Sequence, residues 1–202
     1  MSDKLLVTGA SGHLGKLVLE TLLAQGVPAA KIIATTRDTS KLADFAAKGV
    51  DVRKADFSDP ASLPAAFAGA GRLALISTDS IGQRLAQHKV AIDAAKAAGI
   101  KHIVYTSMPN PTPDSKITFA DEHRGTEEAI KASGLSYTIL RNAWYQENMF
   151  MNMPQVLASG HWYTSAGQGK VSHIARADCA EALATVLASS EAGNKTYTLT
   201  GP

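Results

Sequence analysis

The sequence predicts an α/β protein in which a parallel sheet is doubly wound, with helices on both of its faces. Two observations lead to this fold class. Short β-branched runs alternate with Ala- and Leu-rich stretches of helical spacing along the whole chain, and the predicted strands are apolar throughout. Seven strands are expected, at Lys4–Thr8, Ile32–Thr36, Val50–Lys54, Leu73–Ser77, His102–Thr106, Ser136–Leu140 and Thr196–Thr200. Parallel strands joined by helices require crossover connections, which we expect to be right-handed.

Helical patterns fill the intervals between these strands. Apolar residues recur at helical spacing over Leu14–Leu22, and Gly26 ends the run. A later helix is predicted over Arg176–Ala188, with Asp178 near its start. We interpret Cys179, within this helix, as a small residue of the core.

Residues 142–174 interrupt the alternation of strands and helices. They contain both tryptophans and three of the five methionines. We interpret them as a small lobe beside the sheet. Its methionines are expected to fill the lobe's core, with the lining of an adaptable pocket as the alternative.

Composition restricts the function classes. The chain has 202 residues, 45% of them hydrophobic, with 20 Lys and Arg against 18 Asp and Glu, so its formal net charge is +2. Such a charge is too small to indicate binding to nucleic acid or an anionic membrane. Cys179 is the only cysteine, which excludes intrachain disulfides and Cys-based zinc sites and favours a reduced, cytoplasmic setting. The apolar N-terminal stretch is too short for a signal peptide, and no stretch is long enough for a membrane helix.

A glycine-rich motif directly follows the first predicted strand and opens the first helix. This context is typical of a dinucleotide-binding turn, in which glycines let the backbone approach a pyrophosphate at the helix N-terminus. The alternative is a simple tight turn. The motif therefore predicts a Rossmann-like NAD(P)-binding domain over residues 1–202, with a substrate lobe formed mainly by 142–174. Its predicted cofactor contacts are Gly9, Ser11, Gly12, His13, Leu14 and Gly15.

The end of the second strand predicts which dinucleotide is bound. NAD-binding proteins usually place an acidic residue there, whereas this chain has Thr36 and Arg37. A guanidinium can pair with a 2′-phosphate in bidentate fashion, which favours NADPH. Asp38 follows as either a helix cap or a residual NAD-reading carboxylate, and Arg37 could instead be a solvated surface charge.

Polar residues after the third and fourth strands extend the predicted cofactor site. Asp56 and Phe57 occupy the position that commonly borders the adenine. Ser77, Thr78 and Asp79 lie where the chain would pass the nicotinamide-side ribose. Ordinary polar turns are the alternative in both places.

Several stretches together resemble a known family. They are the glycine motif, the Thr36-Arg37 pair, and the runs 102–107, 121–123 and 137–145. These stretches are similar to atypical short-chain dehydrogenases/reductases, and more narrowly to the NmrA-like group. The likeness extends over essentially the whole chain, and its most specific part is the Leu-Arg-Asn-x-x-Tyr stretch at 140–145. It implies NADPH binding, hydride transfer to planar conjugated acceptors, and a cofactor groove lined by residues 9–15, Arg37, residues 77–79 and the Arg141-Asn142 region. Thr106, at the end of the fifth predicted strand, is also expected to contact the cofactor.

The catalytic pair of typical short-chain dehydrogenases is absent. No tyrosine is followed four residues later by lysine, and the helix where the pair would belong carries His123 and Glu127 instead. Reducing a ketone creates a basic alkoxide that needs a positioned acid, whereas a quinone becomes a far less basic phenolate that can take its proton from water. The missing pair therefore favours quinone or dye reduction. We interpret His123 as part of a charged helix surface, with a proton relay as the alternative.

The acceptor site is predicted just past the sixth strand, at the carboxyl edge where such sheets bind ligands. Asn142 could donate a hydrogen bond to a quinone oxygen, and the rings of Trp144 and Tyr145 could stack on a planar acceptor. Alternatively, both rings belong to the core of the lobe. No metal site is expected, since the six histidines show no ligand spacing.

We therefore expect an NADPH-dependent reductase of quinones or similar planar acceptors. The alternative is a catalytically silent NADP(H) sensor that regulates a protein partner, as in some NmrA-like proteins. The chain could also form a homodimer. Relatives in this family continue with further helices beyond the last strand, so we expect either a naturally short chain or a truncated one, with an open acceptor pocket.

Overall fold

The computed structural model describes residues 4–164, 167–190 and 192–201, and within them a parallel sheet forms the centre of the molecule. The strand order is β3-β2-β1-β4-β5-β6-β7, and every neighbouring pair is parallel. The predicted parallel sheet is thus confirmed. The strands are β1 (Lys4–Val7), β2 (Ile32–Thr36), β3 (Asp51–Lys54), β4 (Ala70–Leu75), β5 (His102–Ser107), β6 (Ser136–Asn142) and β7 (Lys195–Leu199).

The fourth strand differs most from its predicted bounds. It begins at Ala70, where it pairs with Lys4, and ends at Leu75 instead of continuing to Ser77. The reason is that the next backbone groups bond to side chains. The Ile76 N–H donates to Thr8 Oγ1 at 3.2 Å, and the Ser77 N–H donates to Thr106 Oγ1 at 2.8 Å. The chain thereby turns out of the sheet, and Ser77 enters a loop.

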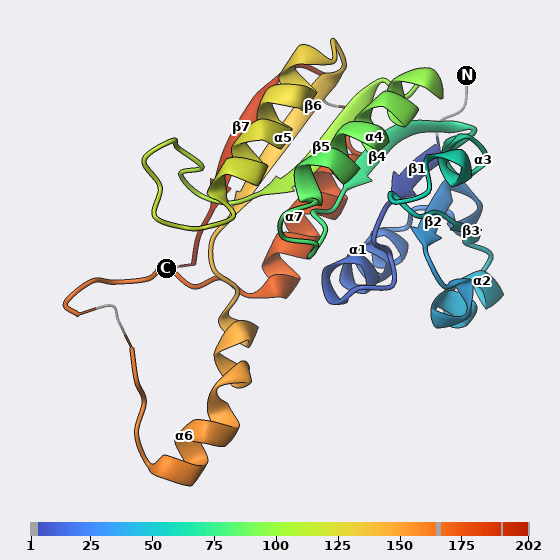
Figure 1. Cartoon of the computed structure of the whole chain (residues 1–202). Coiled ribbons are helices and arrows are strands. Elements are labelled where there is room, and N and C mark those ends of the chain that lie inside the picture. Colours follow the sequence, from blue (N-terminus) through green and yellow to red (C-terminus); the bar gives the residue numbers. More distant parts are fainter. Residues whose placement is uncertain (1–3, 165–166, 191, 202) are drawn as a thin grey trace.

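Helices cover both faces of the sheet, as Figure 1 shows. Alternate residues of β1 explain why, since Leu5 and Val7 belong to one apolar core and Leu6 to the other. The first core includes residues of α1 (His13–Ala24), α2 (Ala43–Ala47) and α7 (Arg176–Ala188). The second includes residues of α3 (Leu63–Phe67), α4 (Arg84–Ala97) and α5 (Ala120–Ala132).

Helix α7 spans the predicted residues Arg176–Ala188. Cys179 within it is fully buried, which confirms the core prediction, and burial raises the pKa of its thiol to about 12. Short 3₁₀ helices complete the connections, at Ala29–Lys31, Thr39–Leu42, Pro60–Ser62 and Gln146–Met151.

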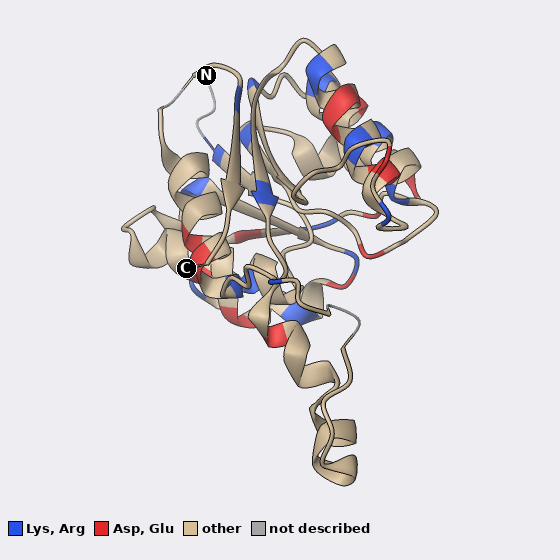
Figure 2. Ribbon diagram, turned by 90° about the vertical axis from the view of Figure 1, so that its left-hand side faces the viewer, with Lys and Arg blue, Asp and Glu red and all other residues tan. Residues whose placement is uncertain are grey.

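The projecting segment, by which we mean the described residues of 146–173 (146–164 and 167–173), extends away from the sheet and carries α6 (Met153–Ser159) (Figure 1). No charged residue lies between Glu147 and Lys170, and Figure 2 shows this part of the ribbon without blue or red. Met151 is 79% exposed and Leu157 is 78% exposed. The prediction that the methionines fill a core is therefore wrong for Met151, because most of its side chain is exposed to water.

Among the described residues, no helix is both long and apolar enough to cross a membrane.

Candidate functional site

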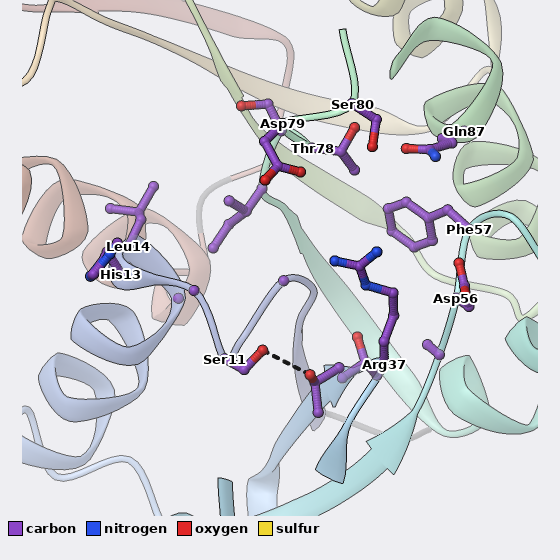
Figure 3. A pocket seen from close by; sticks show the side chains of 18 of the residues that line it. Ser11, His13, Leu14, Arg37, Asp56, Phe57, Thr78, Asp79, Ser80 and Gln87 are labelled. Atoms are coloured by element: carbon purple, nitrogen blue, oxygen red, sulfur yellow. Dashed lines mark hydrogen bonds between the residues drawn. The ribbon is translucent and has the colours of Figure 1, made fainter. Parts of the chain in front are cut away.

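A groove of about 410 Å³ runs along the carboxyl edge of the sheet. The predicted site residues that line it are Gly9, Ser11, Gly12, His13, Leu14, Gly15, Thr36, Arg37, Asp56, Phe57, Ser77, Thr78, Asp79 and Tyr145. Figure 3 shows how several of these side chains converge from separate loops. The predicted residues Thr106, Arg141, Asn142 and Trp144 lie outside its lining. Sequence reasoning did not single out Thr35, Ala55, Ser58, Ile76, Ser80, Gln87 and Arg176, which also line the groove.

The glycine motif makes a tight turn between β1 and α1. Gly9 has a φ of +59°, a left-handed conformation that favours glycine, and its carbonyl accepts a hydrogen bond from the Gly12 N–H at 3.0 Å. A Cβ on Gly15 would lie 2.4 Å from the Gly9 carbonyl oxygen. Only glycine at this position lets α1 approach the loop so closely. The N–H groups of the first turn of α1 thus border the groove.

Arg37 follows β2 at one end of the groove, and Figure 3 shows its side chain extending between the glycine turn and Phe57. The turn and β2 are joined by a 2.8 Å hydrogen bond between the Ser11 and Thr36 hydroxyls. Asp38 caps the following 3₁₀ helix, since its carboxylate accepts from the Ser40 N–H and hydroxyl, which lowers the pKa of Asp38. Within the described part of the chain, Arg37 forms no ion pair.

Helix α4 holds the backbone of Thr78 from both sides. Arg84 Nε donates to the Thr78 carbonyl at 2.6 Å, and His88 Nε2 accepts from the Thr78 N–H at 3.2 Å. Thr106 acts from β5 by accepting the Ser77 N–H, so it supports the lining without joining it. The buried Thr78 hydroxyl oxygen has no hydrogen-bond partner among the described residues. The turn is therefore fixed while one polar atom remains available.

The tautomer of His88 follows from its partners. Thr126 Oγ1 donates to the Glu122 carbonyl at 2.8 Å, so it accepts from His88 Nδ1 at 3.0 Å. Nε2 then carries the lone pair that receives the Thr78 N–H. Burial lowers the pKa of His88 to about 3, with the charges of His123 and Arg84 acting in the same direction. His88 is thus neutral at physiological pH, as this hydrogen-bond pattern requires.

His123 faces the interior, and its interpretation as part of a charged surface is wrong. It is 5% exposed, because α5 turns this side toward the sheet, and Nδ1 lies 2.8 Å from the Tyr105 hydroxyl. Burial lowers the pKa of His123 to about 4 and raises that of Tyr105, so the phenol donates to a neutral imidazole. Neither side chain lines the groove.

Arg141 is held in a buried ion pair. Its Nε and Nη2 donate to the two carboxylate oxygens of Glu127, at 3.0 and 2.7 Å, and the Ser107 hydroxyl donates to Glu127 Oε1 at 2.7 Å. Burial acts to raise the pKa of Glu127, but these hydrogen bonds outweigh it and lower that pKa. The resemblance carried no indication of this partner, which occupies the guanidinium of Arg141.

The predicted acceptor residues have separate surroundings. Asn142 is 7% exposed, its Nδ2 donates to the Tyr145 hydroxyl at 2.9 Å, and its buried Oδ1 has no partner among the described residues. Tyr145 lines the groove, and burial raises its pKa to about 12, so the phenol stays protonated. Trp144 is 51% exposed on the outside. Of the three, only Tyr145 reaches the groove.

Arg176 lies beside Tyr145 because the chain doubles back on itself. Ile174 pairs with Trp144 and Gln146 through backbone hydrogen bonds of 3.1 and 2.9 Å. The Arg176 guanidinium is thereby placed over the Tyr145 ring, with its central carbon 5.0 Å from the ring centroid. Glycine spacing and strand order give no indication of this contact, since it depends on how the loop returns.

Comparisons with known proteins agree with this geometry. Residues 9–190 match a family model described as NAD(P)H-binding. Quinone oxidoreductase 2 of Escherichia coli is 45% identical over 197 residues, which cover 96% of this chain and 68% of that protein. The crystal structure of an E. coli NADPH-dependent quinone oxidoreductase complexed with NADPH superposes with a TM-score of 0.91, at 43% identity over 97% of this chain and 69% of that one. The triphenylmethane reductase of Citrobacter sp. complexed with NADP(H) also gives a TM-score of 0.91, at 40% identity over 98% and 70%.

Proposed function

Because the chain belongs to the NAD(P)H-binding family, we propose that it is an NADPH-dependent reductase that transfers hydride to quinones or similar planar acceptors. One observation carries the proposal. A single groove joins the glycine turn and Arg37 at one end to Tyr145 at the other. The relatives to which the chain is similar are named as reductases of conjugated acceptors: quinones in two cases and triphenylmethane compounds in the third.

The residues of the groove fit NADPH. The first turn of α1 offers backbone N–H groups to a pyrophosphate, at a helix end whose dipole favours negative charge. Arg37 provides a guanidinium without a competing carboxylate among the described residues, as a 2′-phosphate requires. The partnerless hydroxyl of Thr78 offers a further polar contact. In this proposal Thr106 and Arg141 support the NADPH site without contacting NADPH. Thr106 accepts a hydrogen bond from the Ser77 N–H, and Arg141 pairs with Glu127.

The acceptor is proposed to lie at the Tyr145 end. When bound, NADPH supplies a hydride from C4 of its nicotinamide ring. The protein orients the acceptor and limits water around it, and no acid of the Tyr-x-x-x-Lys type is needed when the product is a weakly basic phenolate. Asn142 positions the Tyr145 ring through the Tyr145 hydroxyl, whereas Trp144 lies outside the groove.

We also propose that the chain forms one domain, with a substrate lobe at residues 142–174. The protein is proposed to be cytoplasmic and to form a homodimer. The exposed apolar side chains of the projecting segment support a dimer, since they offer surface that water contacts unfavourably. Light scattering after size-exclusion chromatography should give twice the chain mass at micromolar concentrations. A monomer mass at every concentration would contradict the dimer and leave the proposed reaction untouched.

Two measurements test the reaction. NADPH binding is measured by protein fluorescence, and NADPH oxidation by its near-ultraviolet absorbance with a panel of small quinones. We expect oxidation that depends on both protein and quinone. Tight NADPH binding without oxidation by any quinone would instead favour the NADP(H) sensor and overturn the reductase.

The cofactor preference has its own test. Arg37→Ala should weaken NADPH binding at least tenfold and leave NADH binding nearly unchanged, because only NADPH carries the 2′-phosphate. Lys48→Ala is a matched control, since Lys48 is an exposed cation over the Phe45 ring outside the groove. Equal losses for both cofactors in Arg37→Ala would show that Arg37 does not read the phosphate.

A further inference from the structure

Arg176 is a cation in the groove that has no carboxylate partner among the described residues. Glu147 lies close to Arg176, but its two carboxylate oxygens accept from the Arg176 backbone N–H, at 2.9 and 3.1 Å. Among the described residues the guanidinium donates a hydrogen bond only to an amide, from Nη2 to Asn148 Oδ1 at 3.3 Å. Arg176 thus lines the groove without an ion pair to a described carboxylate.

The surroundings of Arg176 hold this charge in place. Its guanidinium lies over the Tyr145 ring, and the Tyr145 hydroxyl is held by Asn142. The Glu147 contact fixes the start of α7 by binding a backbone group, so it does not depend on the side chain at position 176. A preorganised charge of this kind costs no reorganisation when an anion forms next to it.

The strand order separates the Tyr145 ring, over which Arg176 lies, from Arg37. Arg37 lies after β2 and the glycine turn after β1, whereas Tyr145 follows β6, on the other side of β1 in the sheet. Arg37 and the N–H groups of the glycine turn therefore already offer the phosphates of NADPH their own partners. A nicotinamide ring carries no negative charge in either redox state. The negative charge expected near Arg176 is the one that hydride transfer places on the acceptor.

Resting on the proposed function, we propose that Arg176 is a catalytic residue that binds the oxyanion of the reduced acceptor. Hydride transfer moves two electrons and one hydrogen nucleus from NADPH to the quinone, which yields NADP⁺ and a hydroquinone monoanion. The guanidinium pairs with the oxygen that gains the charge, and a proton from water then completes the hydroquinone. The preferred substrates are thus rings whose reduced form is an aromatic oxyanion.

A coloured phenol tests this site without turnover. 4-Nitrophenol is titrated into the wild-type protein and into Arg176→Gln and Arg176→Lys, and visible absorbance reports how much of the bound phenol is ionised. We expect the wild type to bind the anion about tenfold more tightly than Arg176→Gln and to lower the pKa of the bound phenol. Arg176→Lys keeps the charge and should recover part of both effects.

Arg124→Gln is the matched control, because Arg124 lies on the surface of α5 and pairs with Asp121 and Glu128 outside the groove. It should bind nitrophenolate as the wild type does. Circular dichroism and thermal melting establish that each variant is folded. The kcat for quinones should fall at least tenfold in Arg176→Gln, with the Kd for NADPH changed less than twofold.

Two outcomes would overturn the inference: equal nitrophenolate affinity in wild type and Arg176→Gln, or a loss of NADPH affinity as large as the loss of phenolate affinity. The second would assign Arg176 to the cofactor. Failure of the proposed function would look different. In that case the wild-type protein would still bind nitrophenolate through Arg176, but none of the quinones tested would cause it to oxidise NADPH.

Discussion

Glu127 and Glu128 are neighbours on α5 with opposite surroundings. The Glu127 side chain is 3% exposed and forms an ion pair with Arg141, whereas the Glu128 side chain is 63% exposed and pairs with Arg124. Removing one partner of a buried pair leaves the other charge uncompensated, whereas an exposed pair contributes little. Comparing the two positions therefore distinguishes the stability contribution of a buried carboxylate, Glu127, from that of an exposed one, Glu128.

Glu127→Ala should lower the free energy of unfolding by about 1–3 kcal/mol, because it leaves Arg141 without its carboxylate while 27% of that side chain stays exposed to water. Glu128→Ala, the matched control one residue away, should lower it by less than about 1 kcal/mol. Urea unfolding followed by circular dichroism gives both values. Similar losses for the two variants would show that the buried pair is not what stabilises the junction of α5 with the sheet.

His88 provides a second test at the scale of one residue. His88→Leu leaves the Thr78 N–H without its acceptor, which should cost about 1–3 kcal/mol of stability and weaken NADPH binding severalfold. His88→Gln offers an amide oxygen near the position of Nε2 and should recover most of the NADPH affinity. NADPH titration and urea unfolding measure the two effects. If the glutamine variant binds NADPH no better than the leucine variant, the hydrogen bond to Thr78 is not responsible.

At the scale of elements, the starts of α4 and α7 are each capped by a carboxylate from another part of the chain. Glu122 of α5 accepts from the Arg84 N–H at the start of α4, at 3.1 Å, and Glu147 accepts from the Arg176 N–H at the start of α7. Each contact links two segments far apart in sequence. Together they hold the starts of α4 and α7, the helices that contribute Gln87 and Arg176 to the groove.

Helix α1 depends on a glycine for its approach to the nucleotide turn. Gly15→Ala should weaken NADPH binding at least tenfold, because its Cβ would lie 2.4 Å from the Gly9 carbonyl oxygen and push the turn out of place. Gly125→Ala is the control, since its Cβ would meet the flexible Leu85 side chain at 2.8 Å, between α4 and α5. It should change stability without changing NADPH affinity. Equal NADPH affinities for the two variants would contradict the role given to Gly15.

At the scale of the whole molecule, three buried histidines make stability depend on pH. Burial lowers the pKa of His88 to about 3 and those of His102 and His123 to about 4, from 6.5. As the pH falls below 6.5, the unfolded chain takes up protons that the folded protein does not. Stability is therefore fully present above pH 6.5 and is lost as the pH falls toward these folded-state values.

Between pH 6.5 and 5 each histidine should contribute a slope of up to about 1.4 kcal/mol per pH unit. Urea unfolding at several pH values measures the sum. His102→Gln removes one of the three groups and should reduce the slope by about a third. Since most carboxyls titrate below this window, an unchanged free energy of unfolding between pH 6.5 and 5 would show that the histidines are not held neutral.

The seven strands and the glycine turn could be predicted because they depend on local pattern. Ile32–Thr36 and Arg176–Ala188 match the predicted bounds, since the first is a short β-branched run buried along its whole length and the second is an Ala- and Leu-rich stretch. The misses concern side chains whose partners are distant. The exposure of Met151 and the burial of His123 follow from what lies opposite each residue, which periodicity does not encode.

The sequence by itself determined the doubly wound sheet, the family and the nucleotide-binding turn, because apolar pattern, glycine spacing and the alternation of strands with helices are local properties of the chain. Only the tertiary structure decided which polar residues of β5, β6 and the segments after β6 face the groove. It directed Arg141 and Thr106 into supporting contacts, held Asn142 against Tyr145, and placed Arg176 beside that ring. The physical reason is that a buried polar group must find a partner, and the nearest one in space is usually distant in the chain.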